Sequence, residues 1–363
     1  MDSVRFAVIG LGRFGQKRIR SILANQGLDL VYVSDVNREL TRNVAKQTEA
    51  SGIEFDELLG RRDFDLALVA VPNRDHFDLV VRLLADGHDV WCEKPMSVDT
   101  ARARSMVRTS ILHRRMLKVG SNVRFFPNVM RADELVKTRL QGTPTFVRGW
   151  IGNVGEHLSA GDWHTSKEAS GGGTLLDNGV HFIDLMRHLV GEVRVCKFCE
   201  IYHRTWPFPG MEDNALVVYE LENRTPASMQ CSWTDSGGYM YFEIQYANGF
   251  VQVDCRADKA ALIYKIGENG PISEDFSRVR KRSYDLELER FLSDYRAGVH
   301  PEPTSYDGYR AVNVACTSYR SRSRRMALRT FGTEDRKLQA LFAKSFVFRD
   351  EEPSTPGTRG RVE

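Results

Sequence analysis

The amino-acid sequence predicts an α/β fold, with a doubly wound parallel sheet near the N-terminus and an α+β domain with an open, mostly antiparallel sheet behind it. In residues 1–123, short runs that are apolar throughout alternate with helical patterns, which is typical of parallel strands covered on both faces. From about residue 143, strand patterns follow one another with short turns between them, which is typical of an antiparallel sheet. We therefore expect two domains, over residues 1–123 and 124–345, and a C-terminal tail over 346–363.

Strands and helices are expected to alternate in the first domain. The expected strands are Val4–Ile9, Leu28–Ser34, Leu66–Ala70, Val90–Cys92 and Leu117–Gly120. The expected helices are Arg13–Asn25, Arg38–Ser51, Arg74–Asp86 and Asp99–His113. This order predicts a sheet with helices on both faces.

The second domain is expected to begin with a helix near Asn128–Arg139 and to continue mainly as strands. The expected strands are Thr143–Ile151, Asp213–Leu221, Ala227–Trp233, Tyr239–Tyr246, Gly249–Cys255 and Ala261–Ile266. Asn248 followed by Gly249 is a good hairpin signal. Two late helices are expected over Tyr284–Arg296 and Tyr306–Arg325, and the last stretch, rich in Pro, Gly, Ser and charge, is expected to be disordered.

The composition is that of an ordinary globular protein, with 42% hydrophobic and 27% charged residues. A formal net charge of +3 gives no reason to expect binding to nucleic acid or to an acidic membrane surface. No apolar run reaches the roughly 18 residues that span a bilayer, and the first strand begins too early for a secretory signal, so we expect a cytoplasmic protein. Only Cys196 and Cys199 of the six cysteines have C-x-x-C spacing, and their neighbours indicate sheet, so isolated reduced thiols and no metal site are expected.

The first strand is followed by Gly10-Leu-Gly12-Arg13-Phe14-Gly15, which matches the dinucleotide-binding pattern G-x-G-x-x-G. The pattern is weak alone, but here it follows an apolar strand and opens a helix, as in a Rossmann domain. The glycines permit a tight turn, close approach of a pyrophosphate and close packing of helix on strand, while the helix N-terminus favours phosphate. The alternative is a glycine turn that binds nothing.

An acidic residue ends the second strand: Asp35 lies 20 residues after Gly15. A carboxylate there accepts hydrogen bonds from the ribose hydroxyls of NAD and repels the 2′-phosphate of NADP. Arg38 could instead meet that phosphate, so the sequence favours NAD and leaves NADP possible.

Two polar clusters follow later strands of the first sheet, at the edge where ligands gather in such folds. Pro72, Asn73 and His76 follow one strand, and Glu93-Lys94-Pro95 follow the next. A lysine at a strand end can donate a hydrogen bond to a reacting oxygen and stabilise its developing negative charge. The alternative for Glu93 and Lys94 is a solvated surface ion pair before a turn.

A third candidate cluster lies in the second domain, behind three consecutive glycines at 171–173. Apolar residues at helical spacing predict a helix through His181, with Asp177 four residues earlier on the same face. Histidine suits proton transfer near neutral pH. The alternative is that Asp177 caps the helix and His181 is a hydrogen-bonded core residue.

With these motifs in place, the chain resembles the glucose–fructose oxidoreductase and inositol dehydrogenase (Gfo/Idh/MocA) family, from about Val4 to about Arg325. The resemblance rests on Glu93-Lys94-Pro95 after the glycine motif, and on Asp177-x-Gly179-x-His181-x-x-Asp184 behind the glycine run. It implies a bound NAD or NADP, carbohydrate-like or cyclitol substrates, and a homodimer or homotetramer formed through the open sheet.

The resemblance also implies roles for individual residues. Lys94 would be the catalytic lysine, His181 the general acid/base, and Asp177 a ligand of the substrate hydroxyl or a group that tunes His181. The residues implied to contact the cofactor are Gly10, Gly12, Arg13, Phe14, Gly15, Asp35, Arg38, Pro72, Asn73, His76, Glu93 and Lys94. Those implied to contact the substrate are Asn122, Arg124, Trp163, His164 and Asp177.

This chain departs from the family pattern at several places. Arg18 stands where many members have a histidine, and His164 follows Trp163 where an arginine is common. The segment after Arg325 is longer than the family needs.

The resulting hypothesis is an NAD(P)-dependent oxidoreductase that transfers a hydride between nicotinamide and a secondary alcohol or ketone of a sugar, a sugar derivative or a cyclitol. One alternative is an enzyme that keeps and recycles NAD while catalysing net hydrolysis or elimination on a glycoside. A non-catalytic dinucleotide sensor is a further alternative, which the retained Lys94, Asp177 and His181 disfavour. The arginine-rich stretch Arg320–Arg329 is interpreted as a solvated helix end, not a nucleic-acid site.

Overall fold

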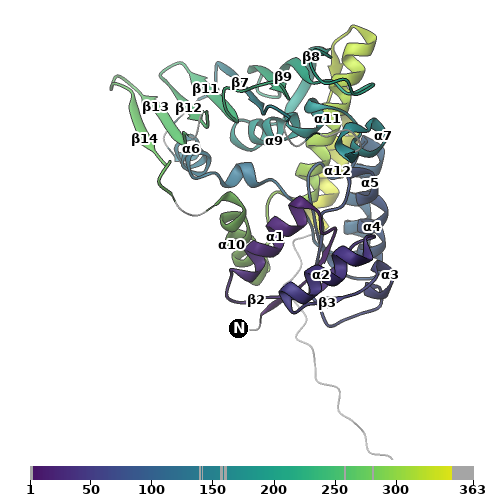
Figure 1. Ribbon diagram of the computed structural model, residues 1–363. Coiled ribbons are helices and arrows are strands. Elements are labelled where there is room, and N and C mark those ends of the chain that lie inside the picture. Colours follow the sequence, from purple (N-terminus) through teal and green to yellow (C-terminus); the bar gives the residue numbers. More distant parts are fainter. Residues whose placement is uncertain are drawn as a thin grey trace, which may run out of the picture.

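The computed structural model describes residues 3–138, 140, 142–155, 158, 162–256, 259–279 and 282–345. It contains two sheets, one of six strands in the N-terminal part and one of nine strands in the C-terminal part (Figure 1). The first sheet is wholly parallel in the order β3-β2-β1-β4-β5-β6, and the second is mostly antiparallel. The predicted fold class is confirmed.

Five of the six strands of the first sheet follow the predicted elements closely, because these five strands are mainly apolar. Its strands are β1 (Val4–Ile9), β2 (Leu28–Ser34), β3 (Ser51–Gly52), β4 (Leu66–Val69), β5 (Asp89–Cys92) and β6 (Leu117–Val119). Its helices are α1 (Arg13–Leu23), α2 (Arg38–Thr48), α3 (Phe55–Leu58), α4 (Asn73–Ala85) and α5 (Thr100–His113). The prediction of helix up to Ser51 is wrong, because Glu49 turns left-handed with φ 60° and Ser51 then pairs with Tyr32.

The second sheet has the order β14-β13-β12-β11-β7-β10-β9-β8-β15, and only the β7–β10 pair is parallel. Its strands are β7 (Phe146–Gly152), β8 (Val193–Tyr202), β9 (Asn214–Leu221), β10 (Pro226–Ser232), β11 (Met240–Tyr246), β12 (Gly249–Asp254), β13 (Ala261–Ile266), β14 (Ile272–Asp275) and β15 (Leu328–Arg329). Cys196 and Cys199 lie in β8, as their neighbours indicated, and all six cysteines are free thiols.

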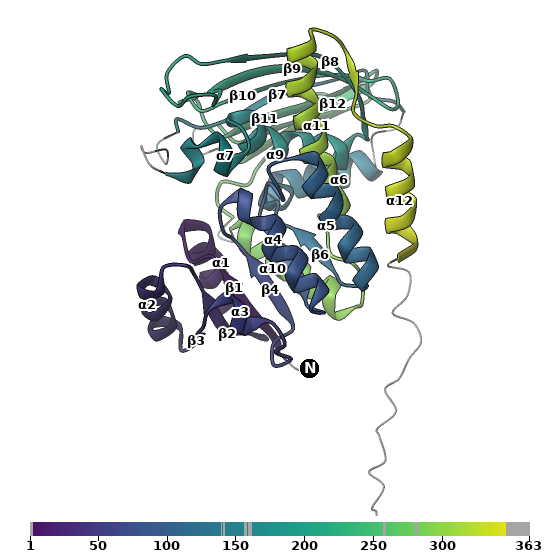
Figure 2. The same cartoon turned by 90° about the vertical axis from the view of Figure 1, so that its right-hand side faces the viewer.

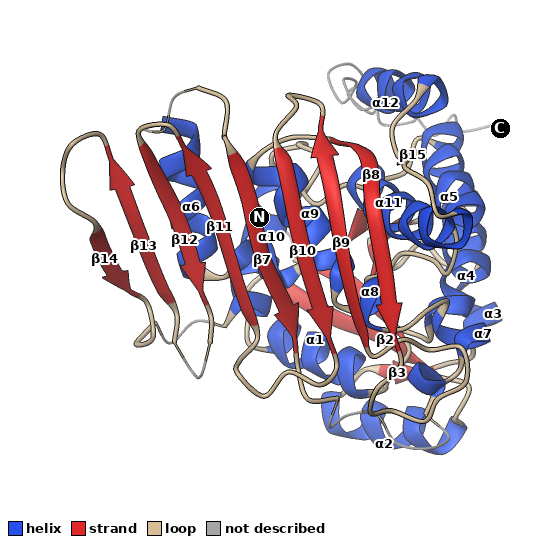
Figure 3. Ribbon diagram, turned by 90° about the horizontal axis from the view of Figure 1, so that it is seen from above, coloured by secondary structure: helices blue, strands red, loops and turns tan. Residues whose placement is uncertain are grey.

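Helices cover one face of this second sheet. They are α6 (Pro127–Thr138), α9 (Gly179–Leu189) and α11 (Ser305–Arg324), which pack on β12, β7 and β8 respectively. Figure 3 looks onto the opposite face, with the described helices behind or beside the strands. The homo-oligomer implied by the resemblance stays a prediction, and this face is the surface that would serve it.

Two C-terminal helices return to the first sheet. In α10 (Ser283–Arg296), the side chains of Leu288, Phe291 and Leu292 join the core beneath β1. Helix α11 places Tyr309 in the core on the other side. The C-terminal part of the chain therefore holds the two sheets together, and the clusters at the strand ends of the first sheet face the second.

The last described helix, α12 (Thr333–Ser345), was not predicted and packs beside α5 (Figure 2). The tail predicted over 346–363 lies outside the described residues. Within the described part of the chain, every helix is too short or too polar to cross a membrane.

Candidate active site

The glycine turn after β1 is shaped by close backbone packing. Gly10 has φ +91°, and a Cβ there would lie 2.6 Å from the backbone of Ala70. A Cβ on Gly15 would lie 1.9 Å from the carbonyl oxygen of Gly10. A Cβ on Gly12, in contrast, would meet nothing within 4 Å, so the surface of the turn is open at this residue. The three glycines thus have the distinct roles that a dinucleotide turn requires.

The first turn of α1 offers its N–H groups to an anion. Gly12 is the N-cap, no side chain caps the helix, and the first turn, which begins with Arg13 and Phe14, contains no acidic residue. Exposed N–H groups and the positive end of the helix dipole form a phosphate site at such a terminus. The turn and the helix start therefore fit the pyrophosphate of a dinucleotide.

Asp35 is fixed beside this turn. Its carboxylate accepts hydrogen bonds from the backbone N–H of Leu11 at 2.8 Å and of Asn37 at 2.9 Å. Arg38 forms an exposed ion pair with Glu54. The carboxylate thus lies directly after β2, the position at which an acidic residue is expected to select NAD over NADP, while the Arg38 guanidinium is paired with Glu54.

Replacing Asp35 with serine is expected to lower the preference for NADH over NADPH by about tenfold or more, because the repulsion of the 2′-phosphate disappears. The measurement is the dissociation constant of each dinucleotide by fluorescence. Asp29→Ser, at an exposed position of the same strand, is the control. An unchanged preference in Asp35→Ser would show that the carboxylate does not select the cofactor.

Glu93 and Lys94 follow β5 and point to different partners. Glu93 is buried and accepts a hydrogen bond from Arg18 Nε at 2.6 Å. Lys94 Nζ donates to Asp177 Oδ1 at 2.8 Å and to the Asp177 carbonyl oxygen at 3.1 Å. The alternative of a solvated surface ion pair is therefore wrong, and the lysine joins the first sheet to the second domain.

Asp177 is the last residue of α8 (Thr174–Asp177), and both of its carboxylate oxygens are engaged. Oδ1 accepts from Lys94, and Oδ2 accepts from the indole Nε1 of Trp233 at 3.0 Å. Burial alone would raise the pKa of this carboxyl, but the charge and hydrogen bond of Lys94 lower it below its ordinary value. Asp177 is ionised and is not a helix cap.

His181 is the third residue of α9 and lines a small cavity together with Lys94. Ser121 and Asp184 belong to the same lining. Burial and the positive charge of Lys94 lower the pKa of His181 to about 3. The imidazole is therefore neutral near pH 7.

The helix predicted through Asp177 and His181 is interrupted. Asn178 separates α8 from α9, and its side chain donates to Thr174 Oγ1 at 3.1 Å and to the Ser232 carbonyl at 3.3 Å. The prediction of one continuous helix was wrong because these side-chain bonds and those of Asp177 compete with helical continuity.

The three glycines before α8 fit a crowded position. Glu212 accepts from the N–H of Gly173 at 3.1 Å and of Leu175 at 2.9 Å, and from the Tyr319 hydroxyl at 2.6 Å. A Cβ on Gly173 would lie 2.0 Å from the Glu212 carbonyl oxygen. The glycine run thus brings α8, and Asp177 at its end, against the second sheet.

The polar cluster after β4 packs against the segment that contains Lys94 and Pro95. Pro72 is the N-cap of α4, and Asn73 Nδ2 donates to the Ser170 carbonyl at 2.9 Å. His76 Nδ1 lies 3.0 Å from the Pro95 carbonyl oxygen, and burial lowers the pKa of this imidazole. Both side chains are buried, and of the two it is His76 that contacts the backbone next to Lys94, while the predicted cofactor contacts of this cluster stay predictions.

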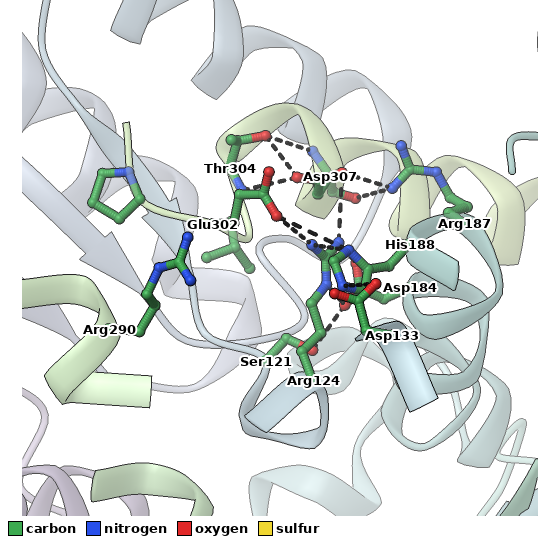
Figure 4. A network of polar contacts seen from close by, with 12 residues as sticks. Ser121, Arg124, Asp133, Asp184, Arg187, His188, Arg290, Glu302, Thr304 and Asp307 are labelled. Atoms are coloured by element: carbon green, nitrogen blue, oxygen red, sulfur yellow. Dashed lines mark hydrogen bonds and ion pairs between the residues drawn. The ribbon is translucent and has the colours of Figure 1, made fainter. Parts of the chain in front are cut away.

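Two residues implied as substrate contacts are engaged within the protein. Asn122 Nδ2 donates to Ser283 Oγ at 2.9 Å. Arg124 is buried, and its Nε and Nη2 both donate to the Asp184 carboxylate, in a network that includes Asp307 (Figure 4). Carboxylates of the chain itself neutralise this guanidinium, and the contacts of Asn122 and Arg124 with a substrate stay predictions.

Trp163 and His164 lie in the short helix η2 (Trp163–Thr165), where their rings stack at 3.6 Å. His164 Nδ1 lies 2.6 Å from Asp162 Oδ1. His164 also contributes to lowering the pKa of Asp177. Residues 156, 157 and 159–161 of this loop are outside the described residues.

The sequence did not indicate three residues that contact the site but lie far from it along the chain. Trp233, Glu212 and Glu287 each bond a site residue or its neighbour, yet each belongs to another element far along the chain. A tryptophan at the end of a strand pattern was the only available signal for Trp233.

Comparisons with known proteins agree with this architecture. Residues 4–121 match the model of the oxidoreductase family with an NAD-binding Rossmann fold, and residues 129–252 match the Gfo/Idh/MocA C-terminal domain. An inositol 2-dehydrogenase/D-chiro-inositol 3-dehydrogenase from Shouchella clausii is 27% identical over 328 residues, covering 86% of this chain and 90% of the relative. A 2,7-anhydro-N-acetylneuraminate hydratase from Mediterraneibacter gnavus is 25% identical over 258 residues, or 70% of this chain and 68% of that protein.

The same fold occurs in levoglucosan dehydrogenase, solved in complex with NADH and L-sorbose. The TM-score is 0.83 at 18% sequence identity, over 92% of this chain and 100% of the other. Taken with the two matched family models, these likenesses lead to one conclusion: the chain belongs to the Gfo/Idh/MocA family of NAD-binding oxidoreductases.

Proposed function

We propose that this enzyme is an NAD-dependent dehydrogenase that oxidises one secondary alcohol of a sugar or cyclitol to a ketone, or catalyses the reverse reduction. The observation that carries the proposal is the ion pair between Lys94 and Asp177, which joins the first sheet to the second domain. His181 lines the same cavity as Lys94. A cationic donor and a neutral base thus meet at the carboxyl ends of the parallel strands.

The residues divide the work of alcohol oxidation between them. His181 accepts the hydroxyl proton, and Lys94 donates a hydrogen bond to the same oxygen as negative charge develops on it. Asp177 holds the Lys94 ammonium in place. NAD, when bound at the turn of Gly10, Gly12 and Gly15, supplies the acceptor for the hydride that leaves the alcohol carbon. The oxidative direction needs an unprotonated base, and His181 is unprotonated near pH 7, although its lowered pKa makes it a weak base before ligands bind.

The substrate class is inferred from the site and from the relatives. A carboxylate, an ammonium group and an imidazole side by side suit a ligand with several hydroxyl groups. The similar proteins named above are a dehydrogenase of inositols and a structure bound to L-sorbose, which supports a polyol substrate.

The test is turnover by the purified chain with NAD and a panel of sugars and cyclitols. We expect at least one compound to produce NADH, followed by its near-ultraviolet absorbance, in proportion to the ketone formed. Binding of NAD without NADH production or product formation from any compound would contradict the proposal.

A second candidate is net elimination, hydration or hydrolysis with NAD that is reduced and reoxidised within each turnover. The similarity to the hydratase from Mediterraneibacter gnavus supports this second candidate. It predicts a product with no accumulating NADH, so product analysis on the same panel separates the two candidates.

A further inference from the structure

The carboxylate of Asp177 is held on both oxygens by donors from different parts of the chain. Lys94 Nζ lies 2.8 Å from Oδ1, and the indole Nε1 of Trp233 lies 3.0 Å from Oδ2. The Trp233 side chain is 1% exposed. A buried N–H group that points at a carboxylate makes one of the stronger hydrogen bonds available in a protein.

Trp233 is itself rigidly placed. Its backbone N–H donates to the Asp213 carbonyl at 2.7 Å, and its carbonyl accepts from Trp206 Nε1 at 2.8 Å. Its ring packs with Leu158 and Met211 in a small hydrophobic cluster. The indole N–H is therefore a fixed point at the end of β10, whereas the Lys94 side chain is long and has three donor hydrogens.

We propose that Trp233 is a positioning residue, whose indole N–H keeps the Asp177 carboxylate in place while Lys94 engages the substrate oxygen. This inference rests on the proposed function. The Lys94 ammonium group donates one hydrogen bond to the Asp177 carboxylate and one to the Asp177 carbonyl. To bind a substrate oxygen as well, it must share these hydrogen bonds or move one of them. If Lys94 were the only group bound to the carboxylate, the carboxylate would rotate together with the ammonium group. Asp177 would then no longer fix the position of Lys94.

The first test is the steady-state kinetics of Trp233→Phe, which keeps an aromatic ring and removes the N–H. We expect kcat to fall by about tenfold, the typical worth of a hydrogen bond to a charged group, while KM for NAD stays unchanged. Trp150→Phe is the matched control, because Trp150 stacks on Tyr241 in the second sheet at a ring distance of 4.8 Å and has no bond to Asp177.

The second test reads the hydrogen bond without turnover. The chain has five tryptophans, so a ¹H–¹⁵N spectrum of the indole groups of the full-length protein contains five signals, and the one missing in Trp233→Phe belongs to Trp233. In Asp177→Asn, which weakens the acceptor, we expect this signal to move further than the other four. A purely space-filling role for the ring would leave it in place.

The results of these tests distinguish a failure of the positioning role of Trp233 from a failure of the proposed dehydrogenase function. A wild-type enzyme that turns over while Trp233→Phe matches Trp150→Phe in kcat would overturn the positioning role and leave the proposed function standing. A Trp233 indole signal that does not shift in Asp177→Asn would also contradict the positioning role. Absence of turnover and of product formation in the wild type, with all five indole signals as expected, would instead refute the proposed function, and the positioning role with it.

Discussion

Lys94→Ala is expected to lower kcat for alcohol oxidation by a factor of about 10²–10³, because it removes the charged donor aimed at the developing alkoxide. His181→Ala should cost about 10²–10⁴, the usual contribution of a general acid or base. Both side chains line one cavity, and Lys94 is fixed by Asp177 at 2.8 Å. Initial rates at saturating NAD and substrate measure the effect.

The controls are chosen to match the chemistry of the replaced side chains. Lys337→Ala removes an exposed lysine of α12, and His113→Ala removes an exposed histidine at the end of α5. Neither control should change kcat or the affinity for NADH. Rates near wild type in Lys94→Ala or His181→Ala would remove these residues from the mechanism.

The sequence allowed five of the six strands of the first sheet, and its glycine turn, to be predicted almost to the residue, whereas the two-residue strand β3 was missed. Strands such as Val4–Ile9 and Leu28–Ser34 are apolar runs bounded by clear turn residues, so their limits are local properties. The same holds for the positions of Lys94, Asp177 and His181 along the chain. Lys94 follows β5 at the sheet edge where ligands gather, whereas Asp177 and His181 approach that edge from α8 and α9 of the second domain, which their spacing in the sequence alone does not indicate.

The parts that were missed depend on non-local contacts. The neighbours of Cys196 and Cys199 indicated sheet, but the bounds of β8 (Val193–Tyr202) were not predicted, because its register shifts near Val195 and Cys196 break the alternation of buried and exposed residues. The buried pair of Arg124 with Asp184 was not predicted, because the two residues lie 60 positions apart along the chain. Trp233 and Asp177 are 56 positions apart, so no sequence spacing could indicate their bond.

A buried network of four charged side chains was also not predicted. It joins Glu93, which precedes Lys94, to Glu287 in α10. Arg18 pairs with Glu93 at 2.6 Å and with Glu287 at 2.7 Å, and Lys118 pairs with Glu287 at 2.8 Å. The Trp91 ring lies against both cations, with Arg18 Cζ at 4.7 Å and Lys118 Nζ at 4.4 Å from its centroid. Two positive and two negative side chains balance, so the loss of one leaves a buried charge without compensation.

Glu287→Gln is therefore expected to destabilise the fold by about 3–5 kcal/mol, the usual cost of removing one member of a buried ion pair. Arg290→Gln on the same helix breaks an exposed pair with Asp294 and should cost about 0–1 kcal/mol. Urea unfolding at pH 7 measures both. Adding Lys118→Met to Glu287→Gln restores the charge balance and should recover part of the loss. A double variant as unstable as the sum of the two single changes would show that charge balance is not what this network provides.

The pH dependence of stability follows from the same residue. Burial would raise the pKa of Glu287, but Arg18 and Lys118 lower it to about 2, from an ordinary value of 4.5. A carboxyl whose pKa is lower in the folded state stabilises the fold fully above its unfolded-state pKa and loses that contribution as the pH falls. The wild type should therefore lose stability between about pH 4.5 and pH 2 more steeply than Glu287→Gln, which has no proton to gain at this position. Parallel unfolding curves of the two proteins across this range would mean that Glu287 is not ionised in the folded protein.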